Sequence, residues 1–79
     1  MNTRLYTVLS DVFGLPPEQI IPELTKEDVS SWDSLKQMDL VNSIEQEYGI
    51  MLEITDIVRM NSVHNIIEVL KEKGVTFGD

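Results

Sequence analysis

The feature that most constrains the fold of this chain is the spacing of its apolar residues, which recur three or four positions apart. Near the start of the chain these residues are Leu5, Val8, Leu9, Val12 and Phe13, and near its end they are Val63, Ile66, Ile67 and Leu70. Such spacing lines one face of an α-helix, whereas a half-buried strand needs strict alternation, which the chain lacks. The pattern therefore predicts an all-α protein.

Glycine and capping residues set the predicted helix boundaries. The first helix covers residues 2–13, and Gly14 ends it because glycine tolerates the left-handed conformation that follows a helix. The second helix begins at Asp33 or Ser34 and continues to Tyr48 before the next glycine.

Two further helices are expected in the last third of the chain. A short helix covers residues 55–60, and a longer one follows an N-cap at Ser62 and ends before Gly74. The tail over residues 75–79 is expected to fray. Together the elements predict a single domain over residues 1–79: a four-helix bundle with three main helices, one short helix and a long first loop.

The two longer connections carry apolar residues that should hold them against the core. The loop over residues 14–32 contains such residues, namely Leu15, Ile20, Ile21, Leu24 and Val29. Short helical turns are expected near residues 17–19 and 25–28 of this loop. The link after the second helix contains Ile50, Met51, Leu52 and Ile54, which we expect to pack inward.

The second helix has two distinct faces. Its predicted inner face carries Met38, Val41, Ile44 and Tyr48, and its predicted outer face carries Leu35, Asp39, Asn42 and Gln46. Leu35 should therefore lie exposed on a polar surface, at the start of the helix.

Composition excludes several classes of function. The 79 residues include no cysteine and one histidine, so the chain can form neither a disulfide framework nor a thiolate metal site. A net charge of -8 repels nucleic acid and anionic lipid and attracts basic proteins. With neither a membrane-spanning run nor an apolar leader, we expect a monomeric cytoplasmic protein.

The residues offer little material for catalysis. His64 is the sole imidazole and falls off the apolar stripe, so we expect it to be exposed and structural. The spacing of Asp28, Asp33 and Asp39 does not match a calcium-binding loop. Taken alone, Asp33-Ser34-Leu35 reads as an ordinary helix N-terminus.

Three segments together nevertheless resemble the acyl carrier protein family. They are Trp32-Asp33-Ser34-Leu35, then Asp39-Leu40-Val41, then Ile44-Glu45-Gln46-Glu47-Tyr48-Gly49-Ile50. The family's long first loop, short third helix and Ser/Thr-capped last helix also have counterparts here, so the resemblance covers nearly the whole chain.

The resemblance implies that Ser34 receives 4′-phosphopantetheine from coenzyme A, through a separate Mg²⁺-dependent phosphopantetheinyl transferase. The chain would then not be an enzyme but would carry acyl thioesters between enzymes of fatty acid, polyketide or related biosynthesis. Acyl-loading and acyl-processing enzymes with basic patches would be its other partners. The residues expected to contact them are Asp33, Leu35, Asp39, Glu45 and Glu47.

The sequence departs from the fatty-acid-synthesis pattern at three positions, which are Trp32, Lys36 and Gln46. The Trp-Asp-Ser-Leu form is similar to specialised stand-alone carriers and some polyketide-type carriers, which favours an accessory carrier. The chain begins at Met1 without a Pro- or Ser-rich linker, which favours a discrete protein over a synthase domain. An aminoacyl or peptidyl carrier, and an unmodified acidic interaction module in which Ser34 only caps a helix, remain the alternatives.

Overall fold

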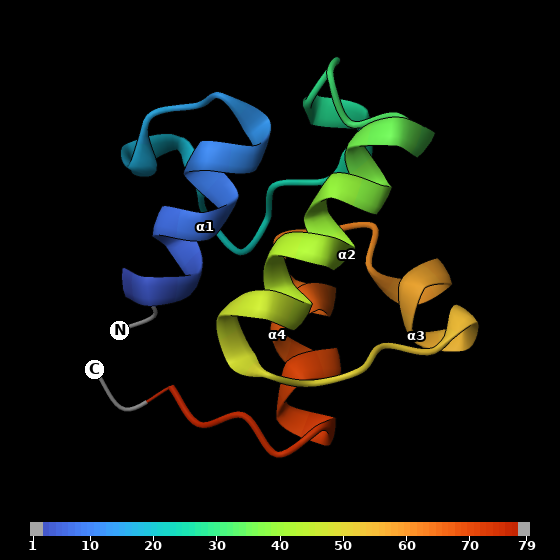
Figure 1. Cartoon of the computed structure of the whole chain (residues 1–79). Helices are drawn as coiled ribbons and strands as arrows, with labels where there is room; N and C mark the ends of the chain where they lie inside the picture. The colour runs from blue at the N-terminus through green and yellow to red at the C-terminus, as the bar shows by residue number, and fades with distance from the viewer. Residues whose placement is uncertain (1–2, 78–79) are drawn as a thin grey trace.

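The computed structural model describes residues 3–77 and confirms an all-α fold of three main helices and one short helix (Figure 1). The elements are α1 (Thr3–Phe13), η1 (Pro17–Gln19), η2 (Lys26–Asp28), α2 (Ser34–Tyr48), α3 (Ile54–Arg59) and α4 (Val63–Glu72). The predicted helical start at Asn2 lies outside the described residues. None of the helices within them is long and apolar enough to cross a bilayer.

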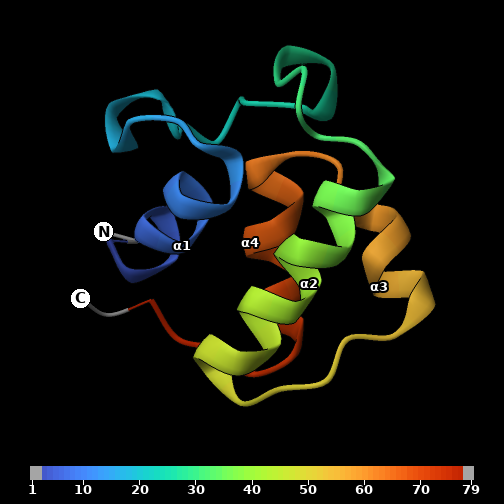
Figure 2. The same cartoon turned by 45° about the horizontal axis from the view of Figure 1, so that its top comes forward.

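Helix α2 occupies the middle of the bundle. In Figures 1 and 2 it lies between α1 and α3 and crosses in front of α4. The long first loop arches from the end of α1 over one end of the bundle to the start of α2. The Ser34 end of α2 therefore stands where this loop meets the helices.

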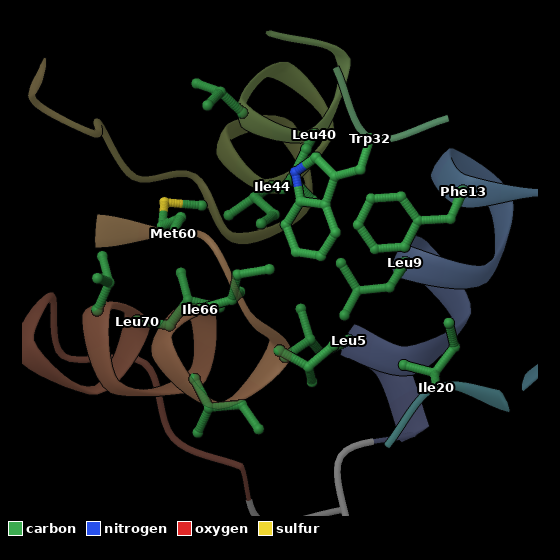
Figure 3. Close-up of a cluster of buried hydrophobic side chains, with 14 of the residues drawn as sticks. Leu5, Leu9, Phe13, Ile20, Trp32, Leu40, Ile44, Met60, Ile66 and Leu70 are labelled. Atoms are coloured by element: carbon green, nitrogen blue, oxygen red, sulfur yellow. The ribbon is translucent and has the colours of Figure 1, made fainter. Parts of the chain in front are cut away.

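The core is formed by the apolar stripes of α1, α2 and α4, by side chains of the long loop, and by Leu52 and Met60 on either side of α3 (Figure 3). The fully buried side chains include Leu5, Leu9, Ile20, Leu40, Ile44, Met60, Ile66 and Leu70. Trp32, at 3% exposure, packs its indole against Phe13 with the ring centroids 4.5 Å apart. This contact joins the end of the loop to the end of α1.

The long loop is ordered, as predicted, and is held by backbone hydrogen bonds to the start of α4. The N–H groups of Val63 and His64 donate to the carbonyls of Leu24 and Pro22 at 2.9 and 3.0 Å. A helix N-terminus leaves its first N–H groups without intrahelical partners, so the loop satisfies two of them. Ser62 caps the same helix, as predicted, by accepting from Asn65 N–H.

The predicted inner face of α2 is wrong at one position, because Met38 is 50% exposed. The buried residues of α2 are Gln37, Leu40, Val41 and Ile44. The buried face of α2 thus includes Gln37 and not Met38, and Gln37 enters the core because its amide finds hydrogen-bond partners there. The predicted outer face is confirmed, with Leu35 80% exposed.

The apolar residues of both connections were predicted to pack inward. This prediction is wrong for Ile21, Met51 and Ile54, which are exposed. In the extended link after α2, successive side chains point to opposite sides. Ile50 and Leu52 face inward, so Met51 faces solvent. Ile54 begins α3 on the side of that helix that faces away from the core.

The predicted fraying of the tail is wrong for residues 75–77. Val75 N–H donates to the carbonyl of Leu70 at 3.0 Å, and Val75 and Phe77 pack against the core. The Phe77 and Tyr48 rings also form a T-shaped contact, with centroids 6.4 Å apart. The last two residues of the predicted tail lie outside the described part of the chain.

Two ion pairs fasten the short helix α3 to α4. Lys73 Nζ lies 2.7 Å from Asp56 Oδ2, and Arg59 forms a two-pronged pair with Glu72 at 2.7 and 2.8 Å. The hydrogen bond from Lys73 and one from the Glu53 N–H hold the pKa of Asp56 below its ordinary value of 3.8. Arg59 likewise lowers the pKa of Glu72 from 4.5.

These ion pairs predict a loss of stability in acid. Both carboxyl pKa values are lowered by folding, so their contribution is complete above the ordinary values and is lost as pH falls through them toward the folded values. We expect the urea midpoint to fall below about pH 4.5 and to depend less on pH in Asp56→Asn/Glu72→Gln. Glu27→Gln, at an exposed carboxylate, is the control and should keep the wild-type pH profile. A double variant with that same profile would contradict the assignment.

Candidate functional site

Ser34 is the first residue of α2 and stands on the surface at the end of the long loop. The cap of this helix is Asp33, whose Oδ1 accepts from Lys36 N–H at 2.9 Å. The backbone carbonyl of Asp33 accepts from Gln37 N–H at 2.8 Å. The capping function is thus assigned to the residue before Ser34, and the hydroxyl of Ser34 is not needed for it.

The Ser34 hydroxyl has no hydrogen-bond partner among residues 3–77, and neither do the N–H groups of Ser34 and Leu35. Covalent modification of a serine requires an accessible hydroxyl. The two free N–H groups and the positive end of the helix dipole favour a phosphate attached there by some tenths of a kcal/mol each, about 0.3–1 kcal/mol. Ser34 therefore fits a covalent phosphodiester.

A hydrogen-bonded pair of buried side chains brackets Ser34 in sequence. Trp32 Nε1–H donates to Gln37 Oε1 at 2.5 Å, and Gln37 Nε2 donates to the carbonyls of Ile57 and Met60 at 3.0 and 3.1 Å. Gln37 is only 9% exposed. The segment that carries Ser34 is therefore fixed both to α1, through Phe13, and to the end of α3.

The structure separates the predicted partner-binding residues into two groups. Leu35 and Asp39 lie exposed on the outer face of α2. The other three take part in internal contacts: Asp33 caps α2, Glu45 Oε2 accepts from Leu52 N–H at 2.9 Å, and Glu47 pairs with Arg4 of α1. The five residues consequently do not form one uniform acidic strip.

Sequence reasoning missed two groups of residues on α2 and α3. Gln37 was not singled out, although an amide five residues after a tryptophan and within the predicted buried arc gives a signal for such a pair. The second group consists of exposed apolar side chains: Met38 on α2, and Ile54 and Val58 on α3, which are 50%, 79% and 72% exposed. Met38 and Ile54 were predicted to pack inward because they are apolar, and no face was predicted for Val58.

Comparison with known proteins places the chain in a family. A family model described as phosphopantetheine attachment site matches residues 3–70. An acyl carrier protein of Saccharopolyspora erythraea is 30% identical over 66 residues, which are 84% of this chain and 70% of that protein. An acyl carrier protein of Thermosynechococcus vestitus is 20% identical over 70 residues, 89% of this chain and 86% of that protein.

A polyketide synthase is also similar. A non-reducing polyketide synthase of Hypocrea jecorina is 32% identical over 76 residues, which are 96% of this chain but 3% of that enzyme. The chain thus belongs to the phosphopantetheine-binding acyl carrier protein family. As a member of this family, the chain carries a covalent 4′-phosphopantetheine group and acts as an acyl carrier in fatty acid or polyketide synthesis.

Asp33 caps α2, whereas the Ser34 hydroxyl makes no hydrogen bond. Replacing each of these residues by alanine should therefore affect stability differently. Asp33→Ala removes the cap and should lower the free energy of unfolding by about 1 kcal/mol. Ser34→Ala removes an exposed, unbonded hydroxyl and should change it by less than about 0.5 kcal/mol. Urea unfolding followed by circular dichroism measures both. Equal losses in the two variants would contradict the assignment of the cap.

Proposed function

We propose that Ser34 is the attachment residue for 4′-phosphopantetheine and that the chain carries acyl groups as thioesters on the thiol of that arm. The observation that carries this proposal is the exposed, unbonded Ser34 hydroxyl at the first position of α2, with capping left to Asp33. When bound, the arm supplies the thiol that a cysteine-free chain lacks. The chain itself then binds and presents its cargo, and the chemistry belongs to its partner enzymes.

We further propose that phosphopantetheinyl transferase and the acyl-loading and acyl-processing enzymes dock on the surface around the start of α2. Leu35 is 80% exposed directly beside Ser34 and supplies an apolar anchor. Met38, Ile54 and Val58 add exposed apolar area on α2 and α3, which lie next to each other (Figure 2). Burial of apolar side chains on docking supplies affinity, and a central few of them dominate it.

The acidic residues are proposed to steer basic partners. The carboxylate of Asp39 has no ion pair or hydrogen bond within residues 3–77, so it is available without rearrangement. Asp33, Glu45 and Glu47 offer a partner only the oxygens that their internal contacts leave open. Exposed charges of this kind mainly raise the association rate and weaken with salt, which suits a carrier that must release each partner.

The buried Trp32 supports the narrower proposal of a specialised carrier. Its indole occupies the position at which the fatty-acid-synthesis pattern has a smaller residue, and it contacts both Phe13 and Gln37.

We also propose that the protein is a monomer in the cytoplasm. Size-exclusion chromatography with light scattering would test the oligomeric state, and cell fractionation would test the localisation.

The attachment site is tested by intact mass spectrometry. Incubation with coenzyme A, Mg²⁺ and a broad-specificity phosphopantetheinyl transferase should add one phosphopantetheine to the wild type and none to Ser34→Ala, because only that hydroxyl accepts the group. Ser31→Ala, at an exposed serine three residues earlier, is the matched control and should be loaded like the wild type. A folded wild type that gains no mass would leave the unmodified interaction module as the better function.

The docking surface is tested by transferase kinetics. Leu35→Ala should lower kcat/KM for loading at least about fivefold, the effect expected for loss of an apolar anchor. Met51→Ala changes an equally exposed apolar residue in the link beyond the opposite end of α2, and it should leave kcat/KM unchanged. Equal losses in both variants would count against a surface centred on Leu35.

A further inference from the structure

The buried carboxamide of Gln37 is the feature of this fold that the carrier function alone does not explain. A core glutamine is costly unless its amide is fully paired. Here the oxygen accepts from Trp32 Nε1–H and the nitrogen donates to two carbonyls, those of Ile57 and Met60. The carboxamide thereby connects the loop, α2 and the end of α3 in one buried polar bridge, hereafter the Trp32–Gln37 bridge.

The bridge lies on the side of α2 to which Ser34 is directed. Glu45 follows Ser34 by eleven residues, close to three helical turns, so the two share one flank of α2. Glu45 Oε2 accepts from Leu52 N–H in the link that leads into α3, which shows that this flank faces the α3 side. The shortest interior route from Ser34 therefore runs between α2 and α3.

An alkyl chain that entered by this route would have to separate Gln37 from α3. It would leave the Met60 carbonyl and the amide nitrogen of Gln37 buried without partners, and the Ile57 carbonyl would keep only the Met60 N–H. This loss offsets the gain from burying methylene groups. The space is also filled from the other side. Trp32 packs against Phe13, with its ring nitrogen on the side away from that ring (Figure 3), and Met60 is fully buried.

We propose that the Trp32–Gln37 bridge closes the space between α2 and α3, so that this carrier keeps its acyl group in solvent and takes short or polar acyl groups. The inference rests on the proposed attachment at Ser34 and adds the class of cargo to it. A short or polar group loses little by staying in water, whereas a long alkyl chain gains from burial in proportion to its length. A closed interior therefore removes the advantage of long chains.

The test uses the one tryptophan of the chain as an internal probe. The wild type is loaded with acetyl-, hexanoyl- and decanoyl-phosphopantetheine from the corresponding acyl-coenzymes A, and intact mass confirms each product. Hydrogen exchange of the Trp32 indole N–H is then followed by NMR, together with Tm. We expect the exchange rate to stay within about twofold across the series and Tm not to rise with chain length.

Gln37→Met is the test variant because it keeps the length of the side chain and removes the polar bridge. In this variant Tm should rise stepwise from acetyl to decanoyl, since the alkyl chain can enter without leaving a buried amide unpaired. Gln46→Met makes the same change on the exposed face of α2 and should behave like the wild type. The wild-type series decides the question by itself if Gln37→Met does not fold.

The possible outcomes are distinct. A loaded wild type whose indole exchange changes tenfold or more with decanoyl, or whose Tm climbs with chain length, would overturn the closed interior while leaving the attachment site intact. A folded Gln37→Met that stays as insensitive to chain length as the wild type would overturn the role of the bridge. Failure of any loading would overturn the proposed function, and this inference with it.

Discussion

The burial of Trp32 is the interaction on which the position of Ser34 depends. Its indole fills the space beside Phe13 at the end of α1, and its N–H is satisfied by Gln37, so the last loop residues before α2 have a single place to lie. A buried indole N–H without an acceptor would cost about 1–3 kcal/mol. The indole ring can therefore be buried here only because its N–H has an acceptor. Because Ser34 stands between Trp32 and Gln37, its hydroxyl is held on the surface by a contact in the core.

The short helix α3 illustrates a different balance. With six residues it is far below the length at which an isolated helix is stable, so its position must come from its neighbours. Gln37 holds its last carbonyls from the α2 side, and the pairs Asp56–Lys73 and Arg59–Glu72 hold it from the α4 side. Its outward face keeps Ile54 and Val58 exposed. Helix α3 thus exposes apolar side chains and is held in place by polar contacts. An ordinary surface helix exposes polar side chains and is held by apolar ones.

The acidic character of the chain is used in two ways. Part of the charge serves the fold, since Asp33 caps α2, Glu45 holds the following link and Glu47 pairs with Arg4. Part of it, including Asp39, stays in solvent, where the proposed basic partners could reach it. The resemblance to carrier proteins treated these positions alike, because a sequence pattern records the residue type and not the hydrogen bond that the residue makes. Only the contacts divide them.

The sequence by itself determined the helices, their boundaries within a residue or two, the ordered first loop and the family, because helical periodicity, capping residues and the motif around Ser34 are local signals. The tertiary structure decided which side of α2 is buried. Met38 was expected inside and Gln37 was not. A polar side chain enters a core only where other groups satisfy its hydrogen bonds, and here these are the Ile57 and Met60 carbonyls, 20 and 23 residues later in the chain. The same holds for the exposed Met51 and the packed Val75, whose environments are set by neighbours that come from other parts of the chain.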